Sequence, residues 1–177
     1  MIKQKAYHCI RRYTSQSQRD VLKNRVSQIR AKVSPALKRW YGTYDNTDLE
    51  RELREHVPSD FEILMVHSSI SNMQPMYKGT AKDLLELLLR LVGPKRTLAM
   101  PVFFFGTPEL FDRAYYRQYP RFDVRRTPSQ MGFVTALFRR RPNVVRSLHP
   151  THSICALGPL ANVCRLRRMN AHAKGLG

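Results

Sequence analysis

The sequence predicts an α/β fold, in which a partial parallel or mixed sheet with flanking helices is preceded by a basic amphipathic helical arm. Two apolar runs of strand length, residues 62–66 and 97–100, lie on either side of a leucine-rich helical segment, residues 81–92. This succession is typical of a right-handed crossover between parallel strands. Ahead of it, apolar residues recur at helical spacing between Leu22 and Trp40.

The composition indicates a folded protein with a strongly basic balance. The 177 residues include 31 Lys and Arg against 13 Asp and Glu, a formal net charge of +18. Hydrophobic content of 42% and charged content of 25% are those of a globular protein rather than a disordered one. A charge this large indicates a polyanionic partner: nucleic acid, an anionic membrane surface or a phosphate-bearing ligand.

Residues 1–46 are expected to form the basic helical arm. Residues 1–44 hold eleven Lys and Arg but a single acid, Asp20. Packing on the main domain or a partner, adhesion to an anionic surface, and disorder all stay open for this arm. Its Arg-rich, acid-poor start also resembles an organellar transit peptide, although it lacks the apolar segment of a secretory signal. The apolar positions recur at steps of three or four residues: Leu22, Val26, Ile29, Val33, Leu37 and Trp40.

Ser34-Pro35 interrupts the apolar pattern of the arm. Serine is a favoured N-cap and proline is favoured in the first turn of a helix. The sequence therefore predicts two helical pieces rather than one.

Residues 47–177 are expected to form the α/β domain. Thr47-Asp-Leu-Glu50 has the pattern of a capping box and begins a helix that ends at Pro58. Thr80 is the expected N-cap of the leucine-rich helix, and Gly93 its C-terminal glycine.

The later part of this domain is expected to be less regular. Residues 106–126 predict a long loop with little regular structure. Thr127-Pro-Ser129 then predicts the cap of a helix over about residues 130–140. Gly158-Pro159 begins a last helix through Arg168.

Three cysteines, Cys9, Cys155 and Cys164, cannot all pair within one chain and show no C-x-x-C spacing. This pattern favours free thiols in a reducing compartment, so a cytoplasmic location is expected. No run of about 18 apolar residues occurs, and no transmembrane helix is predicted.

Polar side chains gather in residues 146–159, where Pro150 restricts the backbone. They form either a loop that satisfies its own backbone or a functional site. His67-Ser68-Ser69 is a second polar cluster, at the carboxyl end of the first predicted strand, where ligands bind in open α/β sheets. The polar residues of the first stretch are Arg146, Ser147, His149, Thr151, His152 and Ser153.

A metal site is a competing interpretation of the same stretch. His149, His152 and Cys155 are spaced by three residues and could ligate an ion from one side of a turn. Pro150 and the lack of a clear fourth ligand argue against it, so no metal is predicted.

Six blocks, taken in order, resemble the aminoglycoside 3-N-acetyltransferase family over roughly residues 60–160. Arg96 departs from the glycine usual in that family before the Thr-Leu pair, which changes the turn but leaves the strand. The blocks are Val66-His-Ser-Ser69, Lys78-Gly-Thr80, Val92-Gly93 with Thr97-Leu-Ala-Met-Pro101, Thr127-Pro-Ser-Gln-Met-Gly132, Phe138-Arg-Arg-Arg-Pro142 and Arg146-Ser-Leu-His-Pro-Thr-His-Ser153.

The resemblance implies transfer of an acetyl group from acetyl-CoA, as co-substrate, to an amino group of an aminoglycoside or related amino sugar. Such transfer needs donors for the thioester carbonyl, a general base, and basic groups for the phosphates of the cofactor. Arg146 is suited to a phosphate, and His149 and His152 to the substrate or to ordering the site. Contacts to the arm and carbonyl of the cofactor are expected from His67, Ser68, Ser69, Ser147, Thr151 and Ser153.

The family's general base and its partner glutamate stand in an Asn-Thr-x-x-His-x-x-Glu type of motif downstream of these blocks. This chain contains no such motif, and His172 does not stand in one. Asp112 and Asp123 are the only acids after Glu109, which leaves few carboxylates for a cationic antibiotic. Weak or absent transferase activity is therefore expected of what looks like the amino-terminal portion of such an enzyme. The alternative is a basic protein that binds nucleic acid or an anionic surface.

Overall fold

The structure is a computed structural model that describes residues 15–107, 110 and 113–166. The chain forms two compact units, residues 1–43 and residues 44–177. Within the described residues, no helix is both long and apolar enough to cross a bilayer.

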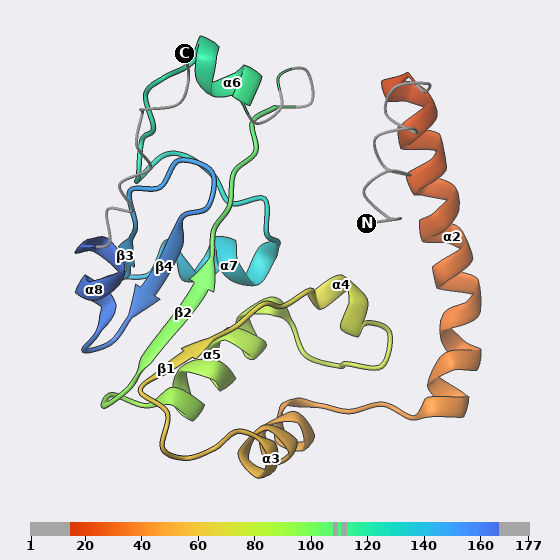
Figure 1. The fold of residues 1–177 in the computed structure, drawn as a ribbon. Helices are drawn as coiled ribbons and strands as arrows, with labels where there is room; N and C mark the ends of the chain where they lie inside the picture. Colours follow the sequence, from red (N-terminus) through yellow and green to blue (C-terminus); the bar gives the residue numbers. More distant parts are fainter. Residues whose placement is uncertain (1–14, 108–109, 111–112, 167–177) are drawn as a thin grey trace. The chain divides into compact units, whose positions relative to one another are not determined.

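The described residues of the first unit, 15–43, contain the helix α2 (Gln16–Tyr41), shown in red to orange in Figure 1. It begins with a capping box, in which the Ser15 hydroxyl accepts from the backbone of Gln18 and the Gln18 side chain accepts from the backbone of Ser15. The expectation of two helical pieces is wrong, because the helix continues through Pro35. A proline removes one internal hydrogen bond and distorts the preceding turn, and the bonds of the neighbouring turns hold the helix together here.

The second unit is built on a four-stranded mixed sheet in the order β1-β2-β4-β3. The strands β1 (Ile63–Met65) and β2 (Thr97–Pro101) run parallel, with Leu64 opposite Leu98. The strand β4 (Ile154–Leu157) is antiparallel to β2 and also to β3 (Val145–Arg146). The α/β class and the mixed sheet with flanking helices are thus confirmed (Figure 1).

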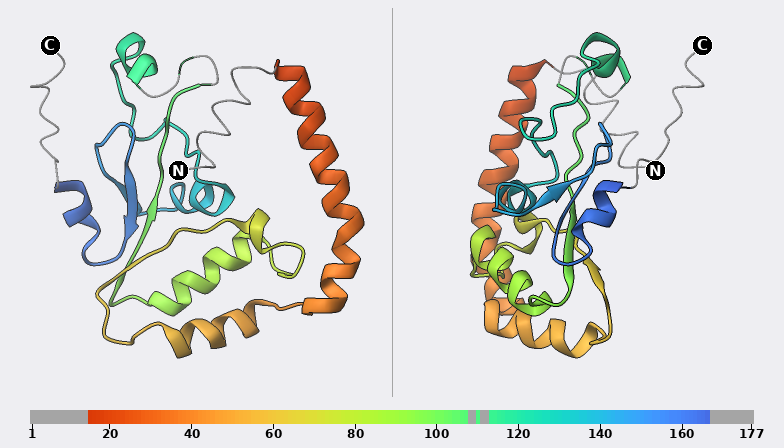
Figure 2. Two further views of the ribbon diagram at one scale, coloured as in Figure 1. Left: turned by 45° about the vertical axis from the view of Figure 1, so that its right-hand side comes forward. Right: turned by 90° about the vertical axis from the view of Figure 1, so that its left-hand side faces the viewer.

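The helix that connects β1 to β2 supplies much of the hydrophobic core. Helix α5 (Ala81–Val92) begins at Thr80, whose hydroxyl accepts from the backbone of Asp83, and ends at Gly93 with a φ of 67°. Both predicted helix ends are confirmed. The leucines of α5 pack with Leu98, Met100 and Phe138 in one buried cluster. Helices α5 and α7 (Phe133–Phe138) lie on one face of the sheet, and α8 (Ala161–Leu166) lies on the other (Figure 2).

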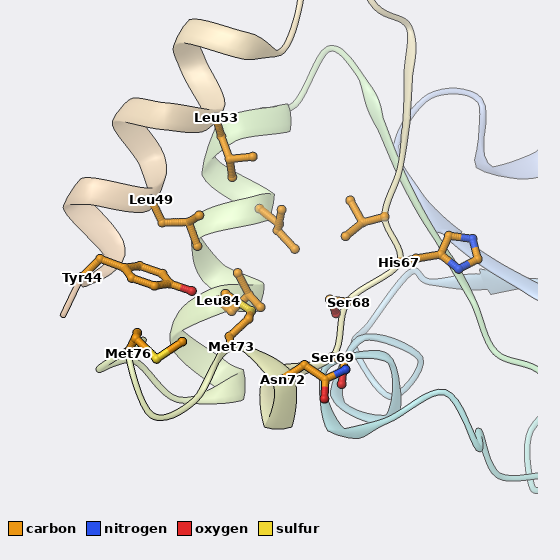
Figure 3. Close-up of a pocket in the computed structure, with 12 residues that line it drawn as sticks. Tyr44, Leu49, Leu53, His67, Ser68, Ser69, Asn72, Met73, Met76 and Leu84 are labelled. Atoms are coloured by element: carbon orange, nitrogen blue, oxygen red, sulfur yellow. The ribbon is translucent and has the colours of Figure 1, made fainter. Parts of the chain in front are cut away.

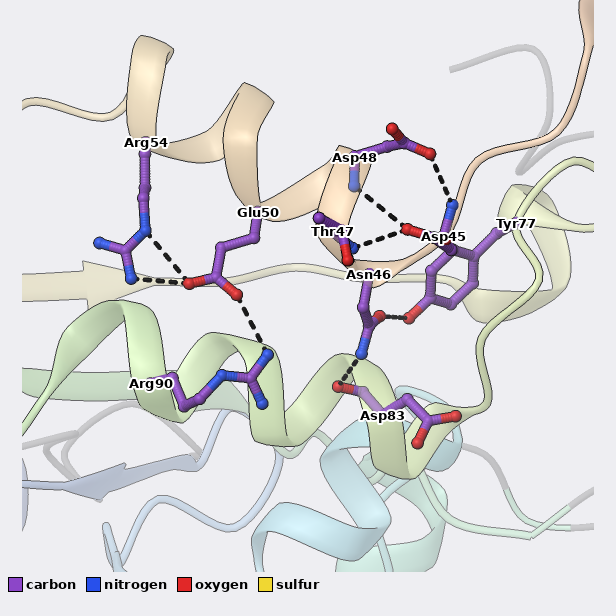
Figure 4. A network of polar contacts seen from close by, with 9 residues as sticks. All are labelled: Asp45, Asn46, Thr47, Asp48, Glu50, Arg54, Tyr77, Asp83 and Arg90. Atoms are coloured by element: carbon purple, nitrogen blue, oxygen red, sulfur yellow. Dashed lines mark hydrogen bonds and ion pairs between the residues drawn. The ribbon is translucent and has the colours of Figure 1, made fainter.

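Helix α3 (Asn46–His56) packs outside α5 and is tied to it by polar contacts (Figure 4). Its N-cap is Asp45 rather than Thr47, since the Asp45 carboxylate accepts from the backbones of Thr47 and Asp48. A carboxylate accepts two backbone N–H groups here, and its negative charge is favourable at the start of a helix. A threonine hydroxyl carries no such charge.

Two contacts join α3 to α5 directly. The Glu50 carboxylate accepts from Arg54 and, across the interface, from Arg90 at 3.1 Å. These two guanidinium groups, Arg54 first, lower the pKa of Glu50. The Asn46 amide donates to the carbonyl of Asp83 at 3.0 Å and accepts from the buried hydroxyl of Tyr77.

The loop regions differ from expectation in three places. Residues 106–126 contain a short helix, α6 (Arg113–Gln118). Helix α7 begins three residues later than expected because Gln130 is bonded across to the segment after β2: its backbone donates to Phe103, and its side chain bonds Phe105 and Gly106. The polar stretch of residues 146–159 contains β4, an apolar strand that the sequence analysis did not predict. Helix α8 starts near the predicted position, and residues 167–168 lie outside the described residues.

Candidate functional site

The polar stretches predicted from the sequence lie at the same edge of the sheet. Because β1 and β2 are parallel, their carboxyl ends face the same edge. Strand β4 is antiparallel to β2, so its beginning reaches that edge as well. The backbone of Val102 donates to Ser153 at 2.8 Å, and that of Phe104 donates to Thr151 at 3.2 Å. Residues 149–153 therefore lie beside the segment that leaves β2, and residues 67–69 follow the neighbouring strand.

A cavity of about 430 Å³ opens at the carboxyl end of β1. Its walls are mainly apolar and come from α3, α5 and the segment around α4 (Ile70–Met73), as Figure 3 shows. The Ser68 hydroxyl lies in this lining, is buried, and has no hydrogen-bond partner among the described residues. Buried hydroxyls are nearly always bonded, so an unpaired one in an apolar wall indicates a position for a ligand's polar atom.

The two neighbours of Ser68 are placed differently. His67 is exposed, and its imidazole points away from the apolar side chains of the cavity (Figure 3). Ser69 precedes α4 as its N-cap, and its carbonyl accepts from Asn72 at 2.9 Å. Of the three predicted residues, Ser68 alone carries a buried hydroxyl in the cavity wall.

Arg146 is buried and holds several separate segments together. Its guanidinium donates to the Ser153 hydroxyl at 2.9 Å, to the carbonyl of Val102 at 2.9 Å and to that of Thr127 at 2.5 Å. A further bond reaches the carbonyl of Val124 at 3.2 Å. Four of its five N–H groups are therefore used inside the fold. The sequence had suggested a phosphate contact for Arg146 and did not predict this structural role.

Ser147 and Ser153 also bond within the sheet. The Ser153 hydroxyl donates to Val102 at 3.0 Å, and the Ser147 hydroxyl accepts from the backbone of Ile154 at 2.9 Å. Both residues are buried. Their hydroxyls order the entry to β4, and the contacts to a cofactor expected from the sequence stay a prediction.

His149, Thr151 and His152 form a cluster on the loop before β4. The backbone N–H of His152 donates to Nδ1 of His149 at 3.0 Å, so the neutral His149 ring carries its hydrogen on Nε2. The Thr151 hydroxyl lies 2.7 Å from Nδ1 of His152, whose ring packs 5.0 Å from that of Phe103. Burial, followed by the neighbouring His152, lowers the pKa of His149. The cluster holds a neutral imidazole at the edge of the sheet.

The metal interpretation of this stretch is disfavoured by chemistry. Nδ1 of His149 already accepts a backbone N–H. Cys155 is a buried free thiol, and burial raises its pKa to about 12. A thiol that holds its proton this strongly is a poor metal ligand, because the thiolate is the ligating form.

A family model and a relative of known activity each match more than half of this chain. The family model described as aminoglycoside 3-N-acetyltransferase matches residues 65–173. Aminoglycoside N(3)-acetyltransferase IV of Salmonella sp is 36% identical over 99 residues, which are 56% of this chain and 34% of that protein.

Solved structures of aminoglycoside acetyltransferases also match this chain. The apoenzyme of aminoglycoside acetyltransferase AAC(3)-IVa matches with a TM-score of 0.53 and 28% identity, over 68% of this chain and 43% of its own. AAC-VIa bound to sisomicin matches with a TM-score of 0.55 and 26% identity, over 68% of this chain and 48% of its own. The chain thus spans less than half the length of each of these relatives.

Replacing Arg146 tests its structural role. Arg146→Met is expected to lower the free energy of unfolding by about 3 kcal/mol or more, because several buried acceptors each lose a donor. Chemical denaturation measures this change. Arg126→Met removes the same charge from a side chain that is 92% exposed and should change stability little. Equal stability of Arg146→Met and the wild type would contradict the structural role.

The His149 environment predicts a pH dependence. Since the pKa of His149 is lowered in the folded state, the unfolded chain binds the proton more tightly, and stability falls as the pH drops below about 6.5. His149→Asn keeps an acceptor for the His152 backbone but does not titrate, so its Tm should fall less between about pH 7 and about pH 5. His67→Asn, at an exposed histidine, should follow the wild type. Parallel Tm profiles for all three proteins would rule out this contribution.

Proposed function

This chain belongs to the aminoglycoside 3-N-acetyltransferase family, and from that premise we propose that it binds acetyl-CoA at the carboxyl edge of its sheet. The proposed reaction transfers the acetyl group to an amino group of an aminoglycoside or related amino sugar. The solved complex of AAC-VIa with sisomicin supports an acceptor of this class.

The observation that carries this proposal is the unpaired Ser68 hydroxyl in the wall of the apolar cavity. An acyl-pantetheine chain is largely apolar and has a few polar atoms, which suits a mainly apolar pocket with one convergent hydroxyl. Ser68 would donate to the thioester carbonyl, where negative charge develops during acyl transfer. The other predicted contacts to the cofactor stay part of the proposal: His67, Ser69, Arg146, Ser147, Thr151 and Ser153.

The chemical step also needs a base to deprotonate the attacking amine. His149 is poorly suited, because its Nδ1 accepts a backbone N–H and its Nε2 carries the ring hydrogen when the ring is neutral. The motif that holds the base in this family does not occur in the 177 residues. We therefore expect this chain to bind acetyl-CoA with weak or no turnover.

Ser68→Ala separates a binding role from a folding role. Removing a buried hydroxyl that has no partner should leave stability unchanged or raise it slightly. If Ser68 contacts acetyl-CoA, the same change should weaken acetyl-CoA binding about tenfold. This is the affinity that corresponds to the loss of one hydrogen bond to the bound ligand. Isothermal titration calorimetry measures the affinity, and thermal melting measures the stability.

Ser71→Ala is the matched control, because Ser71 is an exposed serine of α4 outside the cavity lining. It should leave the affinity at the wild-type value. Wild-type affinity in Ser68→Ala would remove Ser68 from the site, and absence of any saturable acetyl-CoA binding by the wild type would overturn the proposed function.

A second function is favoured by the surface of α2. Apolar side chains at 22, 26, 29 and 33 share one face of the helix and are 44–60% exposed. Trp40 and Tyr41 follow at its C-terminal end and are 86% and 73% exposed. Arg25, Lys32 and Arg39 flank this apolar face at seven-residue spacing. An apolar face bordered by cations and ending in aromatic residues suits an anionic lipid surface.

Pairing of α2 with a second copy is the less favourable arrangement. In a parallel two-stranded coiled coil, positions 26, 33 and 40 would occupy the first core position of each heptad, and Arg25, Lys32 and Arg39 would then flank the seam. Cations at that position of both helices repel across a symmetric interface unless acids face them. The described part of α2 offers only Asp20 as an acid.

Trp40 is the only tryptophan in the chain and therefore reports on α2 alone. Vesicles with phosphatidylserine should shift its emission to shorter wavelengths, vesicles of phosphatidylcholine should not, and added salt should reduce the shift. Ile29→Asn, within the apolar face, should weaken this effect. Val21→Asn, an equally exposed apolar residue of α2 outside that face, should not. A shift with duplex DNA and none with vesicles would assign the arm to nucleic acid instead.

A further inference from the structure

A second cavity, separate from that at Ser68, is lined by four arginines. It has a volume of about 490 Å³ and lies between the segment of residues 124–125, the end of α7 and strand β3. From this lining we infer that the cavity is a binding site for a phosphate group, either a phosphate monoester or a pyrophosphate. The four arginines are Arg125, Arg139, Arg140 and Arg146.

The positive charge of this cavity is not neutralised by its own lining, which contains no carboxylate. Arg146 and Arg139 donate to neutral acceptors, and Arg139 bonds the backbone carbonyl of Arg125 at 2.8 Å. Asp123 is close in sequence but is used elsewhere: it accepts from the backbones of Arg125 and Arg126 and pairs with the side chain of Arg126. Burial, and then the charge of Arg139, lower the pKa of Arg146. An anion would relieve this repulsion.

Arg139 supplies an independent observation. Its Nε is buried and has no hydrogen-bond partner among the described residues. A buried charged N–H without an acceptor is rare in native structures, and a water or an ion usually bonds such a group. Guanidinium groups form short, paired hydrogen bonds to phosphate oxygens, which would satisfy this group.

The remaining walls limit what kind of phosphate fits. Three valines and Leu148 complete the lining, so the guanidinium groups stand against apolar surface. Apolar groups beside the arginines lower the local dielectric constant, which strengthens the attraction between the arginines and an anion. Apolar walls also suit an organic group attached to the phosphate. The cavity therefore fits an organic phosphate better than a fully hydrated small ion.

This phosphate has two possible sources. It could belong to coenzyme A, in which case the inference extends the proposed function, or to an unrelated phosphorylated ligand, in which case it stands without that function. Binding of inorganic pyrophosphate to the full chain tests the site by itself, with calorimetry at constant ionic strength.

The test variant is Arg125→Gln with Arg140→Gln, because both side chains are exposed and removing them should leave the fold intact. The matched control is Arg121→Gln with Arg126→Gln, which removes the same two charges from exposed arginines outside the cavity. We expect the first variant to bind pyrophosphate about tenfold or more weakly and the control to stay within about threefold of the wild type. Tm values of both variants verify that they fold.

Two results would overturn the site: equal loss of affinity in the test and control variants, which is general attraction to a basic protein, or no saturable binding by the wild type. Coenzyme A and its analogue without the 3′-phosphate then identify the source. If the wild type prefers coenzyme A and the test variant loses that preference, the 3′-phosphate occupies the cavity. If pyrophosphate binds and coenzyme A does not, the phosphate site holds while the proposed function fails.

Discussion

The buried guanidinium of Arg146 is the interaction on which the functional edge of this protein depends. It lies on β3, yet its hydrogen bonds reach the segment leaving β2, the start of β4 and the loop around Val124 and Thr127. The segments after β2 and before β4 are already paired with each other, whereas the loop around Val124 and Thr127 belongs to no strand. Without this side chain, the carbonyls of Val124 and Thr127 would lose a donor, and that of Val102 would keep only the bond from the Ser153 hydroxyl. The hydrogen bonds of one side chain thus connect the loop of residues 124–127 to the sheet.

The core and the edge are stabilised in different ways. The core rests on the leucines of α5, which bury against β2 and α7 and need no polar partner. The edge is stabilised by hydrogen bonds of Arg146, Ser147, Ser153 and Gln130, whose partners are mostly backbone groups. Apolar packing tolerates small adjustments, whereas each of these bonds requires a fixed direction. Most polar residues of the edge therefore build it, whereas the Ser68 hydroxyl has no hydrogen-bond partner among the described residues.

The sequence predicted those features whose signal is local. The β1-α5-β2 crossover follows from two apolar runs, a leucine-rich helix, the Thr80 cap and Gly93, all within about 40 residues. The position of residues 67–69 at the end of β1 follows from the same pattern. The strand β4 was missed because four apolar residues stood next to a conspicuous polar stretch. The helix over Pro35 was missed because a proline lowers helix propensity without fixing the outcome.

Features that arise from contacts between distant residues could not be read from the pattern. Arg146 donates to the carbonyl of Val102, which is 44 positions away in the sequence, and no local pattern around either residue predicts this bond. An arginine in a polar stretch suggests a ligand, and only the fold shows that most of its donors are used internally. That the Ser68 hydroxyl has no partner among the residues the structure describes is likewise a property of the surrounding walls, which come from three helices.

The antiparallel position of β4 next to β2 has a consequence for the order of events during synthesis. The crossover from β1 to β2 is complete once residue 101 has been made. The strand β4, which pairs with the other side of β2, is made about fifty residues later. Until then β2 presents an open edge on that side, a place where strands of other chains can add. Chains emerge from the ribosome amino-terminal end first, at a few residues per second or faster. For several seconds of each synthesis, one side of β2 therefore lacks the strand that pairs with it in the folded protein.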